Sequence, residues 1–124
     1  MDINRMIDQV KSLPDYPKVG MILSHNGVVR GTTREGREVT GLRVSVDQEG
    51  LDRLVREQKK HPGIVEVLVE IRADQDLAVG QDVMAIVVAG DIRERVIETL
   101  TDTLEQVKTK ITTKQQFFKN PEEN

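Results

Sequence analysis

Five basic residues stand where proteins commonly bind anions. Arg30 ends an apolar run between two glycines, and Arg93 lies at the start of the last amphipathic segment. Lys108, Lys110 and Lys114 lie toward the end of that segment. Guanidinium groups bind carboxylates and phosphates through paired hydrogen bonds, and a lysine whose pKa is lowered can act as acid, base or nucleophile. The expected chemistry is the binding of a small anionic metabolite, with a lysine available for catalysis.

Each of these residues also has an ordinary structural explanation. Arg30 could be a solvated side chain at a strand end, and Lys108 could complement the dipole at a helix C-terminus. Arg93 is harder to explain, because a cation in the first turn opposes the helix dipole by roughly 0.3 kcal/mol. Glu94 could offset that charge, and Asp91 together with Glu94 matches a helix-capping box.

Other catalytic and metal-binding patterns are missing from the sequence. It has no phosphate-binding loop, no dinucleotide fingerprint, no His-Glu-x-x-His pair and no cysteine. His25, beside Asn26-Gly27, is interpreted as a turn residue, and His61, before Pro62, as a helix end. The sequence supports neither a metal site nor a Ser-His-Asp triad.

The composition is that of one globular domain over residues 1–124. Hydrophobic residues make up 37% and charged residues 31%, which is enough for a core built from Val, Ile and Leu. The net charge of -3 and the 2% of aromatic residues argue against nucleic-acid binding. The acidic start and short apolar runs argue against a secretory signal and a membrane role, and the lack of cysteine fits a reducing, cytoplasmic location.

The apolar spacing predicts an α+β fold, with a mixed β-sheet and helices packed on it. The predicted helices cover residues 2–12 with Asp2 as the N-cap, 47 or 48 to about 60, and 91–111. The predicted strands cover residues 19–24 with a continuation to 30 after a bend at Asn26-Gly27, 39–46, 64–71, 77–79 and 83–89. The strand over 83–89 is almost entirely apolar and is expected at the centre of the sheet. Ile92 is expected to face the core, and 115–124 to form a tail that frays at its end.

The spacing of Arg93 and Lys108 constrains any site that both residues serve. Fifteen residues of a straight helix span about 22 Å at a rise of 1.5 Å per residue. The two side chains of one chain therefore cannot hold one small ligand. A shared site would lie between two subunits, which predicts a homodimer.

Several segments, in order, resemble the large, catalytic subunit of molybdopterin synthase, the MoaE-type family. They are Gly-Val-Val-Arg at 27–30, Leu-x-Val at 42–44, Lys-Lys-His-Pro-Gly-Ile-Val-Glu-Val at 59–67, Leu-Ala-Val-Gly-Gln-Asp-Val at 77–83 and Ala-Gly-Asp-Ile-Arg at 89–93. The likeness runs from about Val19 to Lys114 and leaves residues 1–18 as an N-terminal extension.

This resemblance implies an α/β hammerhead-like dimer that binds a small ubiquitin-like sulfur-carrier subunit at each end, giving a heterotetramer. That partner ends in a Gly-Gly thiocarboxylate and supplies sulfur to cyclic pyranopterin monophosphate, giving molybdopterin. By matching position, Arg30 and Arg93 correspond to arginines that bind the pterin phosphate, one of them from the neighbouring subunit. Lys108 corresponds to the first active-site lysine. No metal or nucleotide cofactor is expected on this subunit.

The sequence departs from the family pattern at two positions. Ile92 stands where the family usually has histidine, and Gln115 where it has its second lysine. Lys114, one residue earlier, is the substitute for that lysine. These departures leave two alternatives to an active enzyme. One is a non-catalytic paralogue that keeps the fold and pterin binding, and the other is a structural or regulatory dimerisation module.

Overall fold

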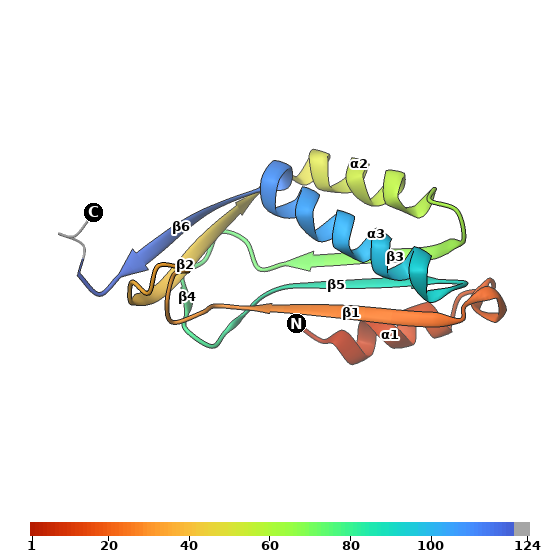
Figure 1. The fold of residues 1–124 in the computed structure, drawn as a ribbon, viewed down its shortest axis with the longest axis horizontal. Coiled ribbons are helices and arrows are strands. Elements are labelled where there is room, and N and C mark those ends of the chain that lie inside the picture. Colours follow the sequence, from red (N-terminus) through yellow and green to blue (C-terminus); the bar gives the residue numbers. More distant parts are fainter. Residues whose placement is uncertain (121–124) are drawn as a thin grey trace.

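Residues 1–120 form three α-helices and six strands in an order expected of an α+β protein. The structure, a computed structural model, describes residues 1–120 (Figure 1). Its elements are α1 (Ile3–Lys11), the 3-10 turn η1 (Tyr16–Lys18), β1 (Met21–Val28), β2 (Val39–Val46), α2 (Gln48–Lys59), β3 (Ile64–Ile71), β4 (Leu77–Ala78), β5 (Asp82–Gly90), α3 (Arg93–Gln106), the π-helical turn η2 (Val107–Ile111) and β6 (Thr112–Phe118). The predicted fold class is confirmed, and the strands over 39–46 and 64–71 end where the sequence indicates.

The strands form two antiparallel sheets rather than the single mixed sheet that was predicted. One sheet has the order β1-β5-β3 and the other β4-β2-β6. Helix α2 leads from β2 of the smaller sheet to β3 of the larger one, and α3 leads from β5 back toward β6. The helices therefore connect strands of different sheets, so no parallel pair forms. Figure 1 shows the smaller sheet extending beyond one end of the helical layer.

Strand β5 lies at the centre of the larger sheet, as its apolar sequence predicts, and both of its faces are covered. Every residue from Val83 to Gly90 is buried. On one face, Met6 and Val10 of α1 pack against alternate β5 residues. On the other face, helices α2 and α3 lie side by side over the sheet (Figure 1). This alternation produces a core made almost entirely of aliphatic side chains.

Strand β1 continues through Asn26 and Gly27, where a bend was predicted. These two residues pair with Ala85 and Met84 of β5, and Nδ2 of Asn26 donates to Asp82 Oδ1 at 3.0 Å. The register shifts only between Gly27 and Val28, next to the strand end. Pairing with the buried central strand thus outweighs the local turn preference of Asn-Gly.

The sequence predicts a tail from residue 115 onward, but residues 115–118 belong to strand β6. The prediction is therefore wrong for these four residues. This strand pairs with β2 from Val46↔Thr112 to Val39↔Phe118. Its sequence, Thr-Thr-Lys-Gln-Gln-Phe-Phe, lacks the alternation of apolar residues that identifies a strand. Such a polar edge strand forms because β2 offers a complete row of hydrogen-bonding partners. Residues 121–124 of the predicted tail lie outside the described residues.

Gly41 of β2 should be essential for the packing of the smaller sheet. A Cβ atom at this position would clash with the backbone carbonyl oxygen of Leu77 in β4. Replacing Gly41 with alanine is expected to lower the free energy of unfolding by about 1–3 kcal/mol, because backbone atoms must move apart. Urea unfolding measures this change. Gly31→Ala is the control, since its Cβ would lie 3.5 Å from Val79 Cγ1, an ordinary contact. Equal losses in both variants would contradict the proposed clash.

Candidate functional site

Lys108 lies on a short π-helical turn that is fixed at both ends. Val107 and Ile111 of this turn are buried, whereas Lys108 and Lys110 are exposed. The Thr112 hydroxyl donates to the carbonyl of Val107 at 3.0 Å, and the backbone N–H of Asp47 donates to that of Ile111 at 2.9 Å. Isolated π-helical turns occur often at functional sites. These hydrogen bonds fix the backbone of the turn, and the side chain of Lys108 extends from it to solvent.

His25 lies within strand β1, on the face of the sheet that the helices cover, which the sequence did not indicate. In β1, Leu23 packs in the core beneath α2 and α3, and His25 is on the same face because side chains alternate along a strand. The ring is half-buried. Burial and then the positive charge of Lys108 lower the pKa of His25 below its ordinary value of 6.5. His25, which was expected to lie in a turn, therefore lies within strand β1.

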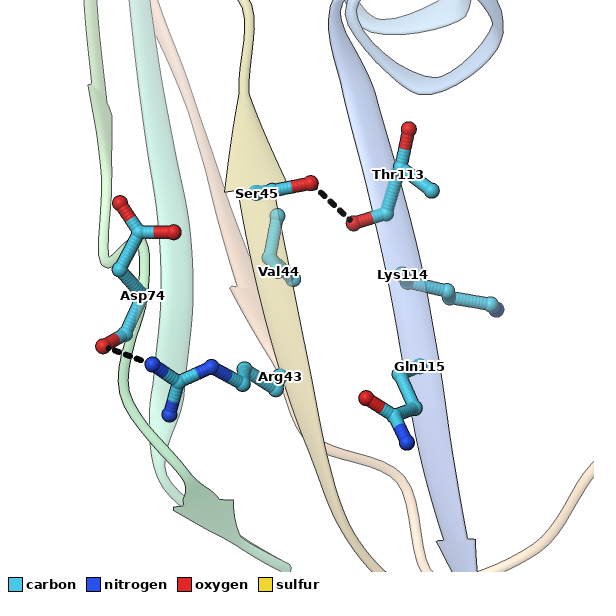
Figure 2. Close-up of a pocket in the computed structure, with 7 residues that line it drawn as sticks. All are labelled: Arg43, Val44, Ser45, Asp74, Thr113, Lys114 and Gln115. Atoms are coloured by element: carbon cyan, nitrogen blue, oxygen red, sulfur yellow. Dashed lines mark hydrogen bonds between the residues drawn. The ribbon is translucent and has the colours of Figure 1, made fainter.

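Lys114 lies on β6, opposite Val44 of β2, and is exposed. It borders a shallow cavity of about 240 Å³ on the smaller sheet that is lined by Arg43, Val44, Ser45, Asp74, Thr113, Lys114 and Gln115 (Figure 2). In Figure 2, the side chain of Lys114 extends away from Arg43 and Asp74. Since β6 directly follows η2, Lys114 and Lys108 come from adjoining elements.

Arg43 is the other cation of this cavity, and it is already held by oxygen atoms of the β3–β4 connection. Its Nη1 atom lies 3.1 Å from Asp76 Oδ1, and its Nη2 atom donates to the carbonyl of Asp74 at 2.7 Å. Asp74 has a positive φ of 61°, which directs this carbonyl within a tight turn. The side chain of Arg43 therefore joins β2 to the β3–β4 connection. Lys114 is the cation of this cavity whose side chain extends to solvent.

Arg30 lies two residues beyond the end of β1 and is exposed. The preceding residue, Val29, is buried, its N–H donates to Gln81 at 2.9 Å, and its carbonyl accepts from Gly80 at 2.9 Å. The backbone before Arg30 is thus tied to the β4–β5 turn. Within residues 1–120, no carboxylate forms an ion pair with Arg30.

Arg93 is the first residue of α3, and its side chain is 78% exposed, with Nε 3.1 Å from Glu94 Oε1. Glu94 therefore offsets its charge. The predicted capping box is not formed, because the N-cap is Ile92 and the carboxylate of Asp91 instead accepts from the N–H of Ile92 and from Arg95. The expectation that Ile92 faces the core is also wrong. It is 48% exposed, since the apolar stripe of α3 begins at Val96.

The structure places Arg93 and Lys108 toward opposite ends of one helical segment, α3 and η2. The α-helical part alone, Arg93–Gln106, spans about 20 Å at 1.5 Å per residue. Figure 1 shows α3 running from the N-terminal end of β1 toward the smaller sheet, where η2 lies. Within one chain, Arg93 and Lys108 are therefore too far apart to bind the same small ligand, as the spacing predicts.

Within residues 1–120, no three His, Cys, Asp or Glu side chains gather as a metal site would require. None of the helices in this range combines the length and apolar character needed to cross a membrane.

Comparison with solved structures shows the same fold in three molybdopterin-related proteins. Molybdopterin cofactor biosynthesis protein E from Burkholderia multivorans has 20% identity and a TM-score of 0.75, covering 93% of this chain and 80% of that one. Molybdopterin synthase from Staphylococcus aureus has 18% identity and a TM-score of 0.71, covering 83% and 77%. The complex of subunits 1 and 2 of molybdopterin-converting factor from Helicobacter pylori has 15% identity and a TM-score of 0.70, covering 98% and 86%.

Sequence comparison identifies the family. A search of the curated proteins found no match. Residues 1–110 match the family described as "MoaE protein", which covers both arginines, Lys108 and the helix α1 that the motifs left outside the resemblance. The chain therefore belongs to the MoaE family, that of the large subunit of molybdopterin synthase, and takes its place in molybdenum cofactor biosynthesis.

Proposed function

We propose that this protein is the large subunit of a molybdopterin synthase. In this role it transfers sulfur from the thiocarboxylate of a small ubiquitin-like partner to cyclic pyranopterin monophosphate. The observation that carries the proposal is the exposed Lys108 on an anchored turn, within the 1–110 match to the family. An ammonium group in this position can stabilise negative charge that develops as sulfur leaves the thiocarboxylate.

The proposed site lies between two copies of the chain. Lys108 comes from one protomer and Arg93 from the other, because one chain holds them at opposite ends of a helical segment. The exposed guanidinium of Arg93 would then bind the phosphate of the pterin. Arg30, without a carboxylate partner in the described residues, would be the second phosphate-binding arginine. Lys114 would line the path of the partner's C-terminal tail.

Two experiments test this function together. The full-length protein should co-purify with a small subunit that ends in Gly-Gly, and a heterotetramer should be seen by light scattering. With the thiocarboxylated form of that subunit, the complex should convert cyclic pyranopterin monophosphate to molybdopterin. A complex that forms but gives no product would contradict the enzymatic role.

The departures at Ile92 and Gln115 favour one alternative, a non-catalytic paralogue that binds the pterin without converting it. The exposure of Ile92 supports this reading, because an aliphatic side chain stands at the solvent-facing N-cap where the family usually has histidine. Restoring histidine with the Ile92→His variant distinguishes an active synthase from a non-catalytic paralogue. An active enzyme should already turn over as it is, whereas a paralogue should bind the pterin and stay inactive until the histidine is present.

A purely structural or regulatory module would bind no pterin. A ligand at 100 times its dissociation constant stabilises a protein by about 2.7 kcal/mol, which is readily seen as a thermal shift. The synthase should therefore melt at a higher temperature with the pterin phosphate present. An unchanged melting temperature with the pterin and with simple phosphates would favour the module.

A further inference from the structure

A second cavity lies in the groove between helix α2 and the α3–η2 segment, which pack side by side over the larger sheet (Figure 1). The two segments run antiparallel here, because Gly50 of α2 lies opposite Ile111 of η2 and Gln58 of α2 bonds to Thr103 of α3. The cavity has a volume of about 260 Å³. Pockets for drug-sized ligands usually measure about 300–1,000 Å³, so this one suits a smaller metabolite.

Gln58 is a buried polar residue of this cavity whose amide orientation is fixed. The residue is 2% exposed. Its Nε2 atom donates to Asp102 Oδ2 at 3.0 Å and to Thr103 Oγ1 at 2.9 Å. The Thr103 hydroxyl gives its own proton to the carbonyl of Thr99 at 2.7 Å, so it can only accept from Gln58. These contacts use both N–H groups of the amide and place the amide oxygen on the other side.

The amide oxygen of Gln58 has no partner among residues 1–120. The hydrogen bonds of this side chain both go through Nε2. In the same range, Nε of Arg37 is the one fully enclosed side-chain atom that lacks a partner, so Oε1 of Gln58 keeps some exposed surface. The cavity that Gln58 lines provides this access. Because buried polar groups are normally hydrogen-bonded, this oxygen requires a donor from solvent or from a ligand.

Gln106 of α3 contributes a second amide oxygen to the cavity. Its Nε2 atom donates to the same Oδ2 atom of Asp102 at 2.8 Å. A carboxylate only accepts hydrogen bonds, so Asp102 turns the NH2 groups of both glutamines toward itself. No donor among residues 1–120 reaches the oxygen of Gln106, which also lines the cavity. Glu57, beside Gln58 in the sequence, adds a carboxylate to this end. The acceptors gathered here favour a positively charged N–H donor.

The other end of the cavity, near the start of α2, carries two cations. Arg53 of α2 and Lys110 of η2 line it and are exposed, and neither forms an ion pair within residues 1–120. Asp47 also lines this end, but it is the N-cap of α2, and its Oδ1 atom accepts from a backbone N–H of the first turn at 3.1 Å. The nearby acids Glu49 and Asp52 do not line the cavity. Together with the positive N-terminus of α2, the two cations favour an anionic group.

We propose that this cavity binds an aliphatic α-amino acid. The ammonium group donates to the amide oxygens of Gln58 and Gln106, and the carboxylate binds the guanidinium of Arg53. The aliphatic side chain packs against Leu54 and Ile111, two buried residues that line the cavity. This site goes beyond the proposed function, because the residues proposed for sulfur transfer do not line it.

Nuclear magnetic resonance of the isotope-labelled, full-length protein tests the proposal. L-leucine, L-isoleucine and L-valine are added separately, and the side-chain amide signals of Gln58 and Gln106 should shift until the site is saturated. L-leucinamide lacks the carboxylate and isocaproate lacks the ammonium group, so each should bind about 10-fold more weakly than L-leucine, or worse. The proposal is wrong if none of the three amino acids moves these signals, or if the two analogues bind as well as L-leucine.

Three variants test the contacts. Arg53→Ala and Gln106→Met each remove one proposed contact from a residue that is not fully buried, and each should weaken L-leucine binding by about 10-fold. Arg56→Ala is the matched control, because Arg56 is an exposed cation of α2 that does not line the cavity. Its affinity for L-leucine should equal that of the unmodified protein. Equal losses in Arg53→Ala and Arg56→Ala would show that only general positive charge matters and would contradict the site.

Lys108→Ala separates this cavity from the proposed sulfur-transfer site. Lys108 lies on the same turn as Lys110 but does not line the cavity. The Lys108→Ala variant should therefore bind L-leucine as tightly as the unmodified protein. Loss of binding in this variant would place the amino acid in the sulfur-transfer site and overturn the inference, whereas the synthase assignment would still depend on its own assay.

Discussion

Replacing Lys108 with alanine is expected to abolish sulfur transfer while leaving the fold intact. The side chain is exposed and makes no ion pair among residues 1–120, and the turn that carries it is held by the buried Val107 and Ile111. Loss of a group that assists proton transfer or stabilises charge lowers rates by a factor of about 100 or more. Product formation from the thiocarboxylated partner measures this effect. Circular dichroism and the melting temperature should match the unmodified protein.

Lys110→Ala is the matched control for this variant. It removes the same charge from the same turn, so a general loss of positive potential would affect both variants equally. The proposed function requires Lys110→Ala to keep most of the activity. A large fall in the melting temperature of Lys108→Ala would instead show that Lys108 is structural.

The chemical role of Lys108 can be separated further. As a transient acyl acceptor, its amine would form an amide with the C-terminal glycine of the partner. That link would be detected by mass spectrometry as a covalent complex that Lys108→Ala cannot form. A proton donor or base would leave no such link, and Lys108→Arg would separate charge stabilisation from proton transfer, because arginine retains its proton.

Replacing Arg93 with alanine is expected to weaken binding of the pterin more than it slows the reaction. A hydrogen bond to a charged group contributes about 1.5–3 kcal/mol, which corresponds to a rise in KM of roughly 10–150-fold. The side chain is largely exposed and is paired only with the adjacent Glu94, so little stability should be lost. Steady-state kinetics with varied cyclic pyranopterin monophosphate measures the change.

Arg95→Ala is the control for Arg93→Ala. Arg95 lies two residues further along α3 and pairs with Asp91 at 2.9 Å, an exposed ion pair that contributes little to stability. Its replacement removes the same charge from the same end of the helix. Equal changes in KM for both variants would show that Arg93 has no specific contact with the phosphate.

Much of the fold follows from the sequence because its strongest signals come from buried residues. The apolar run over 83–89 identifies the central strand, and Asp2 caps its helix as expected, by accepting from the N–H group of Arg5. The second helix begins at Gln48, one of the two expected starts, with Asp47 as its N-cap. Strand β6 could not be predicted, because a polar edge strand depends on its partner β2 rather than on its own pattern. The same dependence on a partner explains why Asn26-Gly27 forms strand rather than turn.

The site is less visible in the sequence than the fold. Arg30, Arg93 and Lys108 were singled out by charge and position, and the family resemblance supplied their expected roles. His25 was assigned to a turn because its neighbours suggest one. Only the pairing of β1 with β5 shows that His25 lies in a strand, with its ring on the face that the helices cover. The alternation of Leu23 and His25 was the one signal in the sequence that could have indicated this face.

The most direct test of a site shared between two chains is subunit mixing. Lys108→Ala and Arg93→Ala protomers, each inactive or weak alone, are unfolded, combined in equal amounts and refolded as dimers. Half of the dimers should then contain one intact site, which should restore about a quarter of the activity of the unmodified dimer. Activity no greater than the average of the two parent variants would contradict the account, as would a protein that remains strictly monomeric.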